Sequence, residues 1–391
     1  MIRLPTDVLQ PGMILGKAIV DEKGQILLRR GVPLTQDYII TLKRRRFSSV
    51  FIMDDETLDI DIEDIISDEV QRNAHRTLGR LFDFVRDISN DFDRADSDAV
   101  VASMQDSGIV RAVRGHEGFK HVEDSVTAIM GELVAADTLT SIGQLRSHDD
   151  VTFNHSINVT VTALLIGKQL HLNQQDLKRL GVGCMLHDIG KVFIHPDLLH
   201  IASPSPEVTR QLREHPRLGY ELLRTRNPDA VMTNHVALEH HERQDGFGYP
   251  RGLQGTNTIS RPSRGRQNIL LIAEIVTVAD VYDLLSVSRP GRPALPPQQI
   301  ANTMRRLAGT FLNQAIVEHF LLMLPIFPVG IGIVVRSGRY GNYRGIVIKM
   351  NKDEPERPVI RLLTNPRGDR ITPIELDLKH EQTITVEAQL H

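Results

Sequence analysis

The sequence predicts a mainly α-helical protein with a small β-rich module at each end. Between residue 70 and about residue 325, apolar residues recur at helical spacing. Before residue 55 and after residue 326, short apolar runs are instead separated by Gly, Asn, Asp and Pro. We therefore expect four parts: an N-terminal β-rich module (1–55), a helical linker or stalk (56–140), a large helical domain (141–325) and a C-terminal module resembling a small β-barrel (326–391).

The N-terminal module is expected to contain short strands and one helix. The apolar runs Ile14–Val20 and Ile26–Leu28 flank a turn-forming segment, Asp21–Gly24. A short helix is predicted near Gln36–Lys43, and a strand at Ser49–Met53. At the other end of the chain, strands are predicted at 330–335, 344–349 and 359–363, forming a small barrel or sheet.

The segment between these modules and the helical domain carries two amphipathic patterns. One helical face is formed by Leu78, Leu81, Phe82 and Val85, and another by Val126, Ile129 and Leu133. Such helices fit either a connecting bundle or a dimerisation stalk. The sequence leaves both alternatives open, and with them the oligomeric state, for which a homodimer is one alternative.

Composition excludes some classes of protein. The 391 residues carry a net charge of −3, so no overall basic field predicts binding to a long nucleic acid. No apolar run is free enough of charge to predict a membrane span, and the first residues lack a secretory signal. Cys184 is the only cysteine, which excludes an intramolecular disulfide and favours a reducing, cytoplasmic location.

A first group of metal-binding residue types surrounds His187 and Asp188. They follow an apolar helical face, and Gly190 is expected to end that helix. His155 and Asp280 each lie within a predicted apolar helix, where a buried carboxylate is costly unless it binds a metal or another partner. These nitrogen and oxygen ligands suit Fe, Mn or Zn better than Ca or Mg.

A second group consists of three more histidines. His215 lies at a break between two helical segments, and His240 and His241 follow a predicted helix. With Asp188 shared, these imidazoles could hold a second metal. Two ions roughly 3.5–4 Å apart are a known device for hydrolysing phosphate esters, in which a hydroxide held between them attacks phosphorus.

Two segments closely resemble the paired motifs of the HD-GYP family, HDxGK and HHExxDGxGYP. They are His187–Lys191 and His240–Pro250, in the same order as in the family. The resemblance covers residues from about 141 to 325. It implies an all-helical HD-GYP bundle around a site of two or three metals. It also implies hydrolysis of cyclic di-GMP, or in some members of cyclic GMP-AMP.

The resemblance also implies a role for individual residues. Lys191 resembles the lysine that binds the phosphate and acts on the leaving oxygen, together with the catalytic metal ligand Asp188. Arg289 and Arg292 resemble substrate-binding residues. The implied metal ligands are His155, His187, Asp188, His215, His240, His241 and Asp280. The loop beside the site comprises Asp245, Gly246, Gly248, Tyr249 and Pro250.

Three departures from the family pattern bear on the metal number and the substrate. Val151 stands where trinuclear members have a glutamate ligand, so two ions, Fe or Mn, are expected. The segment Thr256–Gln267 looks like an insertion. Leu199–Pro204 replaces the Lys-Pro-Gly that often follows the first motif. The last two changes affect the rim that faces the substrate.

Plainer interpretations stand beside the functional ones. Lys191 could serve only as a cation near a helix C-terminus, and Arg289 and Arg292 could be solvated loop charges. Cys184 fits a core position better than a ligand. Glu242 and Asp283 fit the role of groups that orient ligands.

Three functions remain to be distinguished: an active cyclic dinucleotide phosphodiesterase, a non-catalytic receptor for the dinucleotide, and a phosphohydrolase acting on mononucleotides. The complete set of seven candidate ligands and Lys191 favours the first. A receptor would signal through the flanking modules or through a protein partner at the Gly246–Pro250 loop.

Overall fold

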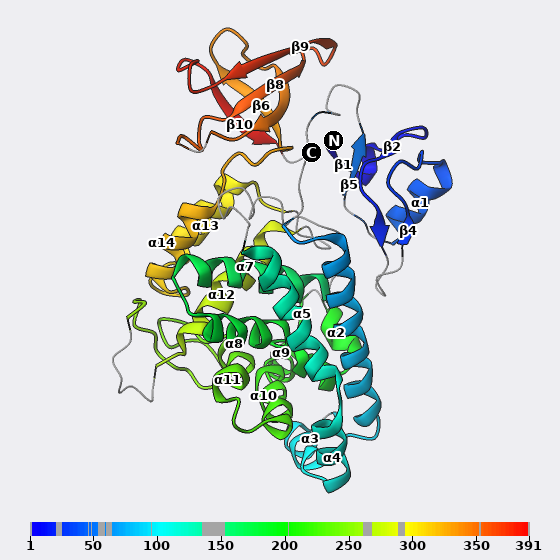
Figure 1. Cartoon of the computed structure of the whole chain (residues 1–391), viewed down its shortest axis with the longest axis vertical. Helices are drawn as coiled ribbons and strands as arrows, with labels where there is room; N and C mark the ends of the chain where they lie inside the picture. Colours follow the sequence, from blue (N-terminus) through cyan, green and yellow to red (C-terminus); the bar gives the residue numbers. More distant parts are fainter. Residues whose placement is uncertain are drawn as a thin grey trace.

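The computed structural model describes residues 2–20, 26–45, 47, 49–53, 59, 65–94, 96–134, 153–201, 203–260, 268–287, 294–351 and 353–389. Helices make up the larger part of the molecule, and two small β modules lie together at one end of its long axis (Figure 1). The predicted fold class is confirmed: a helical body accompanied by small antiparallel sheets from both terminal regions.

The helical body is centred on α7 (Phe153–Gln169), which is buried on nearly all sides. A helix that is apolar all round belongs in a core rather than at a surface. α7 packs against α8 (Gln174–Met185) and α12 (Leu271–Ser286). The remaining elements are η4 (Ile189–Phe193), η5 (Pro196–His200), α9 (Pro206–Leu212), α10 (His215–Arg226), α11 (Val231–Glu239), α13 (Pro297–Leu307) and α14 (Gln314–Met323).

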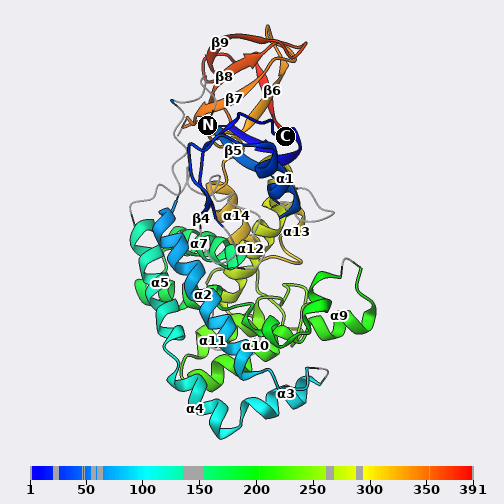
Figure 2. The same ribbon diagram turned by 90° about the vertical axis from the view of Figure 1, so that its right-hand side faces the viewer.

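Within the described residues 65–134, four helices share the core of this body. They are α2 (Asp68–Ile88), α3 (Ser97–Met104), α4 (Ser107–Gly115) and α5 (Gly118–Leu133). Both amphipathic faces predicted from the sequence are buried in the same hydrophobic cluster as α7 and α8. α2 packs along α7 (Figure 2), and α5 packs on α8. These helices therefore pack on the helical body, and the choice between a connecting bundle and a dimerisation stalk stays a prediction.

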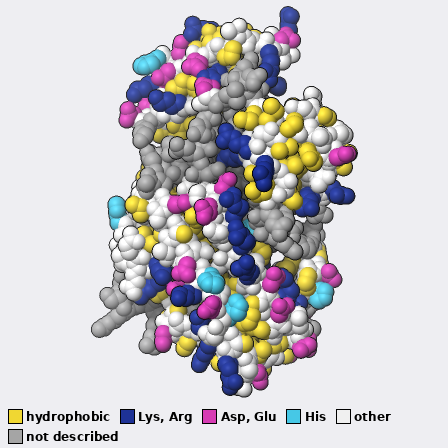
Figure 3. Space-filling view, turned by 45° about the vertical axis from the view of Figure 1, so that its right-hand side comes forward, with side chains coloured by type: hydrophobic (Ala, Val, Ile, Leu, Met, Phe, Trp, Pro, Cys, Tyr) yellow, Lys and Arg dark blue, Asp and Glu magenta, His cyan; other side chains and the backbone are white. Residues whose placement is uncertain are grey.

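The N-terminal module contains a sheet of order β1-β5-β2 and a β3–β4 hairpin. Its elements are β1 (Ile2–Pro5), η1 (Thr6–Val8), β2 (Ile14–Leu15), β3 (Ile19–Val20), β4 (Ile26–Leu28), α1 (Gln36–Arg44) and β5 (Ser49–Met53). Hydrophobic side chains gather on one face of the upper part of the molecule in Figure 3. Within this module the exposed large ones are Val8, Ile14, Ile26, Tyr38 and Ile40.

The C-terminal module is one antiparallel sheet of order β10-β6-β7-β8-β9. Its strands are β6 (Gly332–Ser337), β7 (Arg344–Lys349), β8 (Val359–Thr364), β9 (Arg370–Asp377) and β10 (Thr385–Gln389). The first three were predicted to within two residues. β9 and β10 were not, because they are the edge strands, and their largely exposed side chains give a weak apolar pattern.

The two β modules touch through a small apolar contact, and an ion pair joins the C-terminal module to Asp59, just after the N-terminal module. Phe51 of the N-terminal module packs against Ile346 of β7. Arg361 of β8 donates to both carboxylate oxygens of Asp59, at 2.7 and 2.6 Å. This pair lowers the pKa of Asp59 to about 2.

Among the residues that the structure describes, no helix combines the length and the apolar composition that crossing a membrane requires.

Candidate metal centre

His187 and Asp188 lie in the turn between α8 and η4. α8 ends at Met185, so the expectation that Gly190 ends this helix is wrong. Gly190 instead permits a close approach between segments. A Cβ at this position would lie 1.9 Å from the carbonyl oxygen of His215 and 2.5 Å from the amide nitrogen of Gly219. Only glycine lets η4 lie this close to α10, which brings Asp188 near His215.

Asp188 lies between two sets of histidines, and each carboxylate oxygen faces one set. Its Oδ2 lies 3.4 Å from Nε2 of His187 and 3.9 Å from Nε2 of His155. Its Oδ1 lies 3.4 Å from Nε2 of His215 and 3.8 Å from Nε2 of His240. The carboxylate is 3% exposed. A single buried carboxylate thus faces two neighbouring ligand groups, as a bridging ligand would.

The first group is built by three segments of chain. His155 comes from the first turn of α7, His187 and Asp188 follow α8, and Asp280 comes from α12. Nε2 of His155 lies 3.2 Å from Oδ1 of Asp280. Ligand atoms of His155, His187 and Asp188 lie within 4.8 Å of one another. These four side chains could therefore share one ion.

The second group is formed by His215 at the start of α10 and by His240 and His241 at the end of α11. Nε2 of His215 lies 3.3 Å from Nε2 of His240 and 3.2 Å from Nε2 of His241. Pro216 fits the first turn of α10, where no backbone donor is needed. The structure thus brings together all seven residues that the sequence predicted as ligands.

The other ring nitrogen, Nδ1, of four histidines is held by a partner. Nδ1 of His187 lies 2.6 Å from the carbonyl oxygen of Cys184, and Nδ1 of His215 lies 2.7 Å from that of Leu212. Nδ1 of His240 lies 2.9 Å from the carbonyl oxygen of Ala237. In His155 the partner is Oδ2 of Asp283, at 2.7 Å. Nδ1 as the donor leaves the lone pair on Nε2, as metal ligation requires.

The pKa of His155 shifts in the opposite direction from those of the other candidate histidine ligands, including its neighbour His187, whose pKa burial lowers. Burial alone would lower the pKa of His155, but hydrogen bonds to Asp280 and Asp283 raise it to about 10. Burial lowers the pKa of His215 and of His241 to about 3. The second group is therefore neutral near pH 7, the form in which imidazole binds a metal.

The donor set fits divalent metal ions. No hydrogen-bond donor in the described part of the chain reaches the buried Oδ1 of Asp188. A buried carboxylate oxygen without a donor is costly, and a cation offsets that cost. The pKa of Asp188 is well below its usual value, although burial opposes this, because Lys191 and the histidines favour the anion. Imidazole together with carboxylate suits Fe, Mn or Zn.

Lys191 reaches the centre from η4. Its ammonium donates to Oδ2 of Asp188 at 2.5 Å, and its side chain is 36% exposed. It lies in a 3-10 helix that begins directly after Asp188. A flexible cation with one side open to solvent can contact an anion bound at the metals.

The predicted loop lies beside the second group. Gly248 packs on the preceding backbone, since a Cβ there would lie 2.5 Å from the amide nitrogen of Arg243. The ring of Tyr249 stacks on His241, with 4.7 Å between ring centres. Glu242 accepts from the backbone amides of Arg251 and Leu253, and these contacts hold the loop. The loop thereby covers one side of the candidate ligands.

Sequence reasoning missed a polar network beneath this loop. Gln244 donates to Glu274 of α12, and Asn313 donates to the other carboxylate oxygen of Glu274. The backbone amide of Asn257 donates to Gln244. Gln244 stands at a variable position of the second motif, so its contact with Glu274 of α12 could not be expected from the motif.

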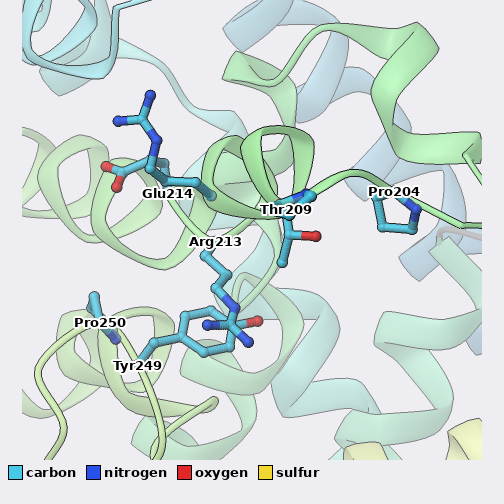
Figure 4. A pocket seen from close by; sticks show the side chains of 8 residues that line it. Pro204, Thr209, Arg213, Glu214, Tyr249 and Pro250 are labelled. Carbon is cyan, nitrogen blue, oxygen red and sulfur yellow. The ribbon is translucent and has the colours of Figure 1, made fainter.

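Sequence reasoning also missed a pocket of about 490 Å³ between α9, α10 and the Tyr249–Pro250 segment. Figure 4 shows the side chain of Arg213 extending from the α9–α10 junction to the ring of Tyr249. The guanidinium lies 5.0 Å from the centre of that ring. Arg213 precedes His215 by two residues, and that proximity was the available signal.

Some predicted positions lie outside the described residues. These are Arg289, Arg292, Val151 and the 261–267 part of the predicted insertion. Their roles stay predictions. The described start of that insertion, Thr256–Ser260, packs on Asn313, whose side chain donates to the carbonyl oxygen of Thr258.

Comparison with known proteins gives a consistent result. The family model described as HD domain matches residues 152–285. The chain is 29% identical to cyclic di-GMP phosphodiesterase PA4108 of Pseudomonas aeruginosa, over 62% of this chain and 55% of that protein. It is 31% identical to cyclic di-GMP phosphodiesterase response regulator RpfG of Xanthomonas campestris, over 59% and 58%. The chain thus spans a little over half the length of these relatives.

A relative with a different named substrate also matches. The chain is 34% identical to 3'3'-cGAMP-specific phosphodiesterase 3 of Vibrio cholerae, over 48% of this chain and 39% of that protein. Among solved structures, the HDG"Y"P protein Bd1817 of Bdellovibrio bacteriovorus aligns over 83% of this chain, with 16% identity and a TM-score of 0.40. The HD-domain match spans α7 to α12 and includes both motifs, so residues 152–285 form an HD domain, and the chain is similar to the cyclic dinucleotide phosphodiesterases named above.

Proposed function

We propose that this protein is a metal-dependent phosphodiesterase that hydrolyses a cyclic dinucleotide, with cyclic di-GMP as the substrate. The observation that carries the proposal is the position of Asp188, whose two oxygens face two separate sets of histidines. That arrangement suits a pair of adjacent divalent ions, which is a device for phosphate-ester hydrolysis. The names of two relatives supply the substrate, and the Vibrio cholerae relative makes 3'3'-cGAMP the competing one.

Each proposed ion has its own ligands. Three side chains, His155, His187 and Asp280, would hold one ion together with Oδ2 of Asp188. The other ion would be held by His215, His240, His241 and Oδ1 of Asp188. Iron or manganese suits this donor set. Such ions, when bound, activate water and offset the charge that develops on the phosphate.

Side chains of the protein would bind the phosphate and protonate the leaving oxygen. The ammonium of Lys191, held beside Asp188, would donate to a phosphate oxygen and protonate the leaving oxygen. Cys184 is not suited to act as a nucleophile, because burial raises the pKa of its thiol far above the usual value. The proposal therefore assigns the attack to water and predicts no covalent nucleotidyl-enzyme.

The test uses the full chain, purified without oxygen. Its metal content should be about two ions per chain, one for each ligand group. Reloaded with Fe(II) or Mn(II), it should convert cyclic di-GMP to a linear dinucleotide or to GMP on a chromatography column, faster than it converts 3'3'-cGAMP. Tight binding without turnover would instead indicate a receptor. Turnover of mononucleotides alone would indicate a different phosphohydrolase.

A lysine variant tests the role of Lys191. Lys191→Ala should lower kcat roughly a hundredfold or more, because a proton donor to the leaving oxygen is lost. Its metal content should stay near wild type, since the proposed ligands are untouched. Lys178→Ala is the matched control, because Lys178 pairs with Glu123 on the outer side of α8. Loss of the metals in Lys191→Ala would show that Lys191 is structural.

Two further parts of the proposal concern surroundings. A cytoplasmic location fits the single buried cysteine, and cell fractionation would test it. The side chain of Phe247, at the tip of the loop, is 82% exposed, which fits a signalling partner that docks there. Phe247→Ser should weaken such a partner while leaving the metals in place.

A further inference from the structure

The pocket between α9, α10 and the loop has the chemistry of a nucleotide subsite. Flat apolar walls come from Pro204, Pro206, Pro250 and the ring of Tyr249, and Thr209 adds a hydroxyl. A volume of about 490 Å³ lies in the range of pockets that take small molecules. Flat apolar and aromatic surfaces favour a planar heterocycle such as a nucleobase.

Arg213 is the cation of this pocket that is free to bind an anion. Two arginines on either side are occupied: Arg210 pairs with Glu207, and Arg217 pairs with Glu214 and Asp98. Among the described residues no carboxylate pairs with Arg213, whose guanidinium lies over the ring of Tyr249. A planar guanidinium without a carboxylate partner keeps its donors available for a phosphate.

Tyr249 links this pocket to the metal centre. Its ring stacks on His241, a proposed metal ligand, and also contacts the guanidinium of Arg213. The backbone amide of Tyr249 donates to the carbonyl oxygen of His241 at 3.2 Å, which fixes the ring beside that ligand. The ring of Tyr249 therefore contacts both the pocket and His241, a proposed metal ligand.

We propose that this pocket binds the half of the cyclic dinucleotide that is not being cleaved, with Arg213, placed over the ring of Tyr249, holding the second phosphate and the proline walls packing on its purine base. The inference rests on the proposed function, which places the scissile phosphate at the metals. A cyclic dinucleotide carries two phosphates and two bases, so one phosphate at the metals leaves the other half to be bound nearby. Arg213 is then a specificity residue that contacts substrate away from the reacting atoms.

The experiment compares two substrates on the metal-loaded full chain. Cyclic di-GMP spans the metals and the pocket, whereas bis(p-nitrophenyl) phosphate has one phosphate and needs only the metals. Arg213→Ala should raise KM for cyclic di-GMP about ten- to a hundredfold, the loss expected for charge-assisted hydrogen bonds. The relative loss with bis(p-nitrophenyl) phosphate should be much smaller. Arg213→Lys, which keeps the charge but not the fork, should lie between wild type and Arg213→Ala.

Arg224→Ala is the matched control. Arg224 lies on α10 and over a tyrosine ring, Tyr220 at 5.9 Å, but it does not line the pocket. This variant should keep the wild-type KM. Metal content and melting temperature are measured for every variant, so that misfolding is seen directly.

The outcomes separate the inference from the function beneath it. If wild type turns over cyclic di-GMP and Arg213→Ala has the same KM as wild type, the subsite is overturned and the proposed function stands. Equal losses on both substrates would show that Arg213 only supports the fold, which also overturns the subsite. Turnover of bis(p-nitrophenyl) phosphate but of no cyclic dinucleotide by wild type would remove the function and the inference together.

Discussion

The two halves of the candidate metal centre obtain their negative charge differently. In the first half, His155 lies between Asp280 and Asp283, and Asp188 lies close by. In the second half, the imidazoles of His215 and His240 lie near Oδ1 of Asp188, and their Nδ1 atoms meet backbone carbonyls. The first half thus has carboxylates of its own, whereas the second depends on the shared one.

The two carboxylates beside His155 explain why its pKa shifts in the opposite direction from those of His187 and the second-half histidines. Carboxylates raise the pKa of His155 to about 10 against the effect of burial, while burial lowers the pKa of His215 and of His241 to about 3. Asp188 can supply negative charge to both halves because its two oxygens face different histidines. The predictions that follow test how far each half depends on Asp188.

The largest effect should come from Asp188→Ala, which removes a ligand from both halves. We expect loss of metal from both halves. Turnover should fall by more than the roughly hundredfold loss that follows when a residue that only orients a ligand is removed. Metal analysis of the purified variant, with activity, is the measurement. Asp197→Ala, at an exposed carboxylate in η5, is the control and should match wild type. Full metal stoichiometry in Asp188→Ala would contradict the bridging role.

The second prediction separates the halves. His155→Ala should lose about one ion per chain, and His215→Ala should lose the other, because each ligand serves one half. Anomalous scattering from crystals of each variant would show which position is empty. If either variant lost both ions, the two halves would not bind metal independently.

The third prediction concerns the packing that brings the halves together. Gly190→Ala places a methyl group against the backbone of His215 and Gly219, so η4 must move away from α10. Overpacking of this kind costs about 1–3 kcal/mol or more in the free energy of unfolding. The second half should lose metal affinity more than the first. Gly131→Ala is the control, since a Cβ there meets no atom within 4 Å. Equal stability of both variants would contradict this reading.

The smallest effect should come from Asp283→Asn. This change weakens the hydrogen bond that orients His155 but removes no ligand. Loss of such a partner lowers metal affinity about 10- to 100-fold, and here only the first half should be affected. Competition with a chelator measures the two affinities. An equal loss in both halves would show that the histidine network acts as one unit.

Much of the helical body could be predicted from the sequence, because its signals are local. The apolar pattern around His155 and Asp280 predicted the helices that carry them, and the break before Pro216 placed His215 at a helix start. The edge strands β9 and β10 were missed because an exposed strand has no strong alternation to detect.

The sequence by itself determined which residue types could bind metal and on which helices they lie. Tertiary structure decided how they meet. Contact between Gly190 and the backbone of α10, the division of Asp188 between two groups, and the choice of Asp283 and backbone carbonyls as Nδ1 partners all join segments far apart in the chain. The pairing of Arg213 with Tyr249 does so too. Such contacts depend on packing between helices, which spacing along one helix cannot reveal.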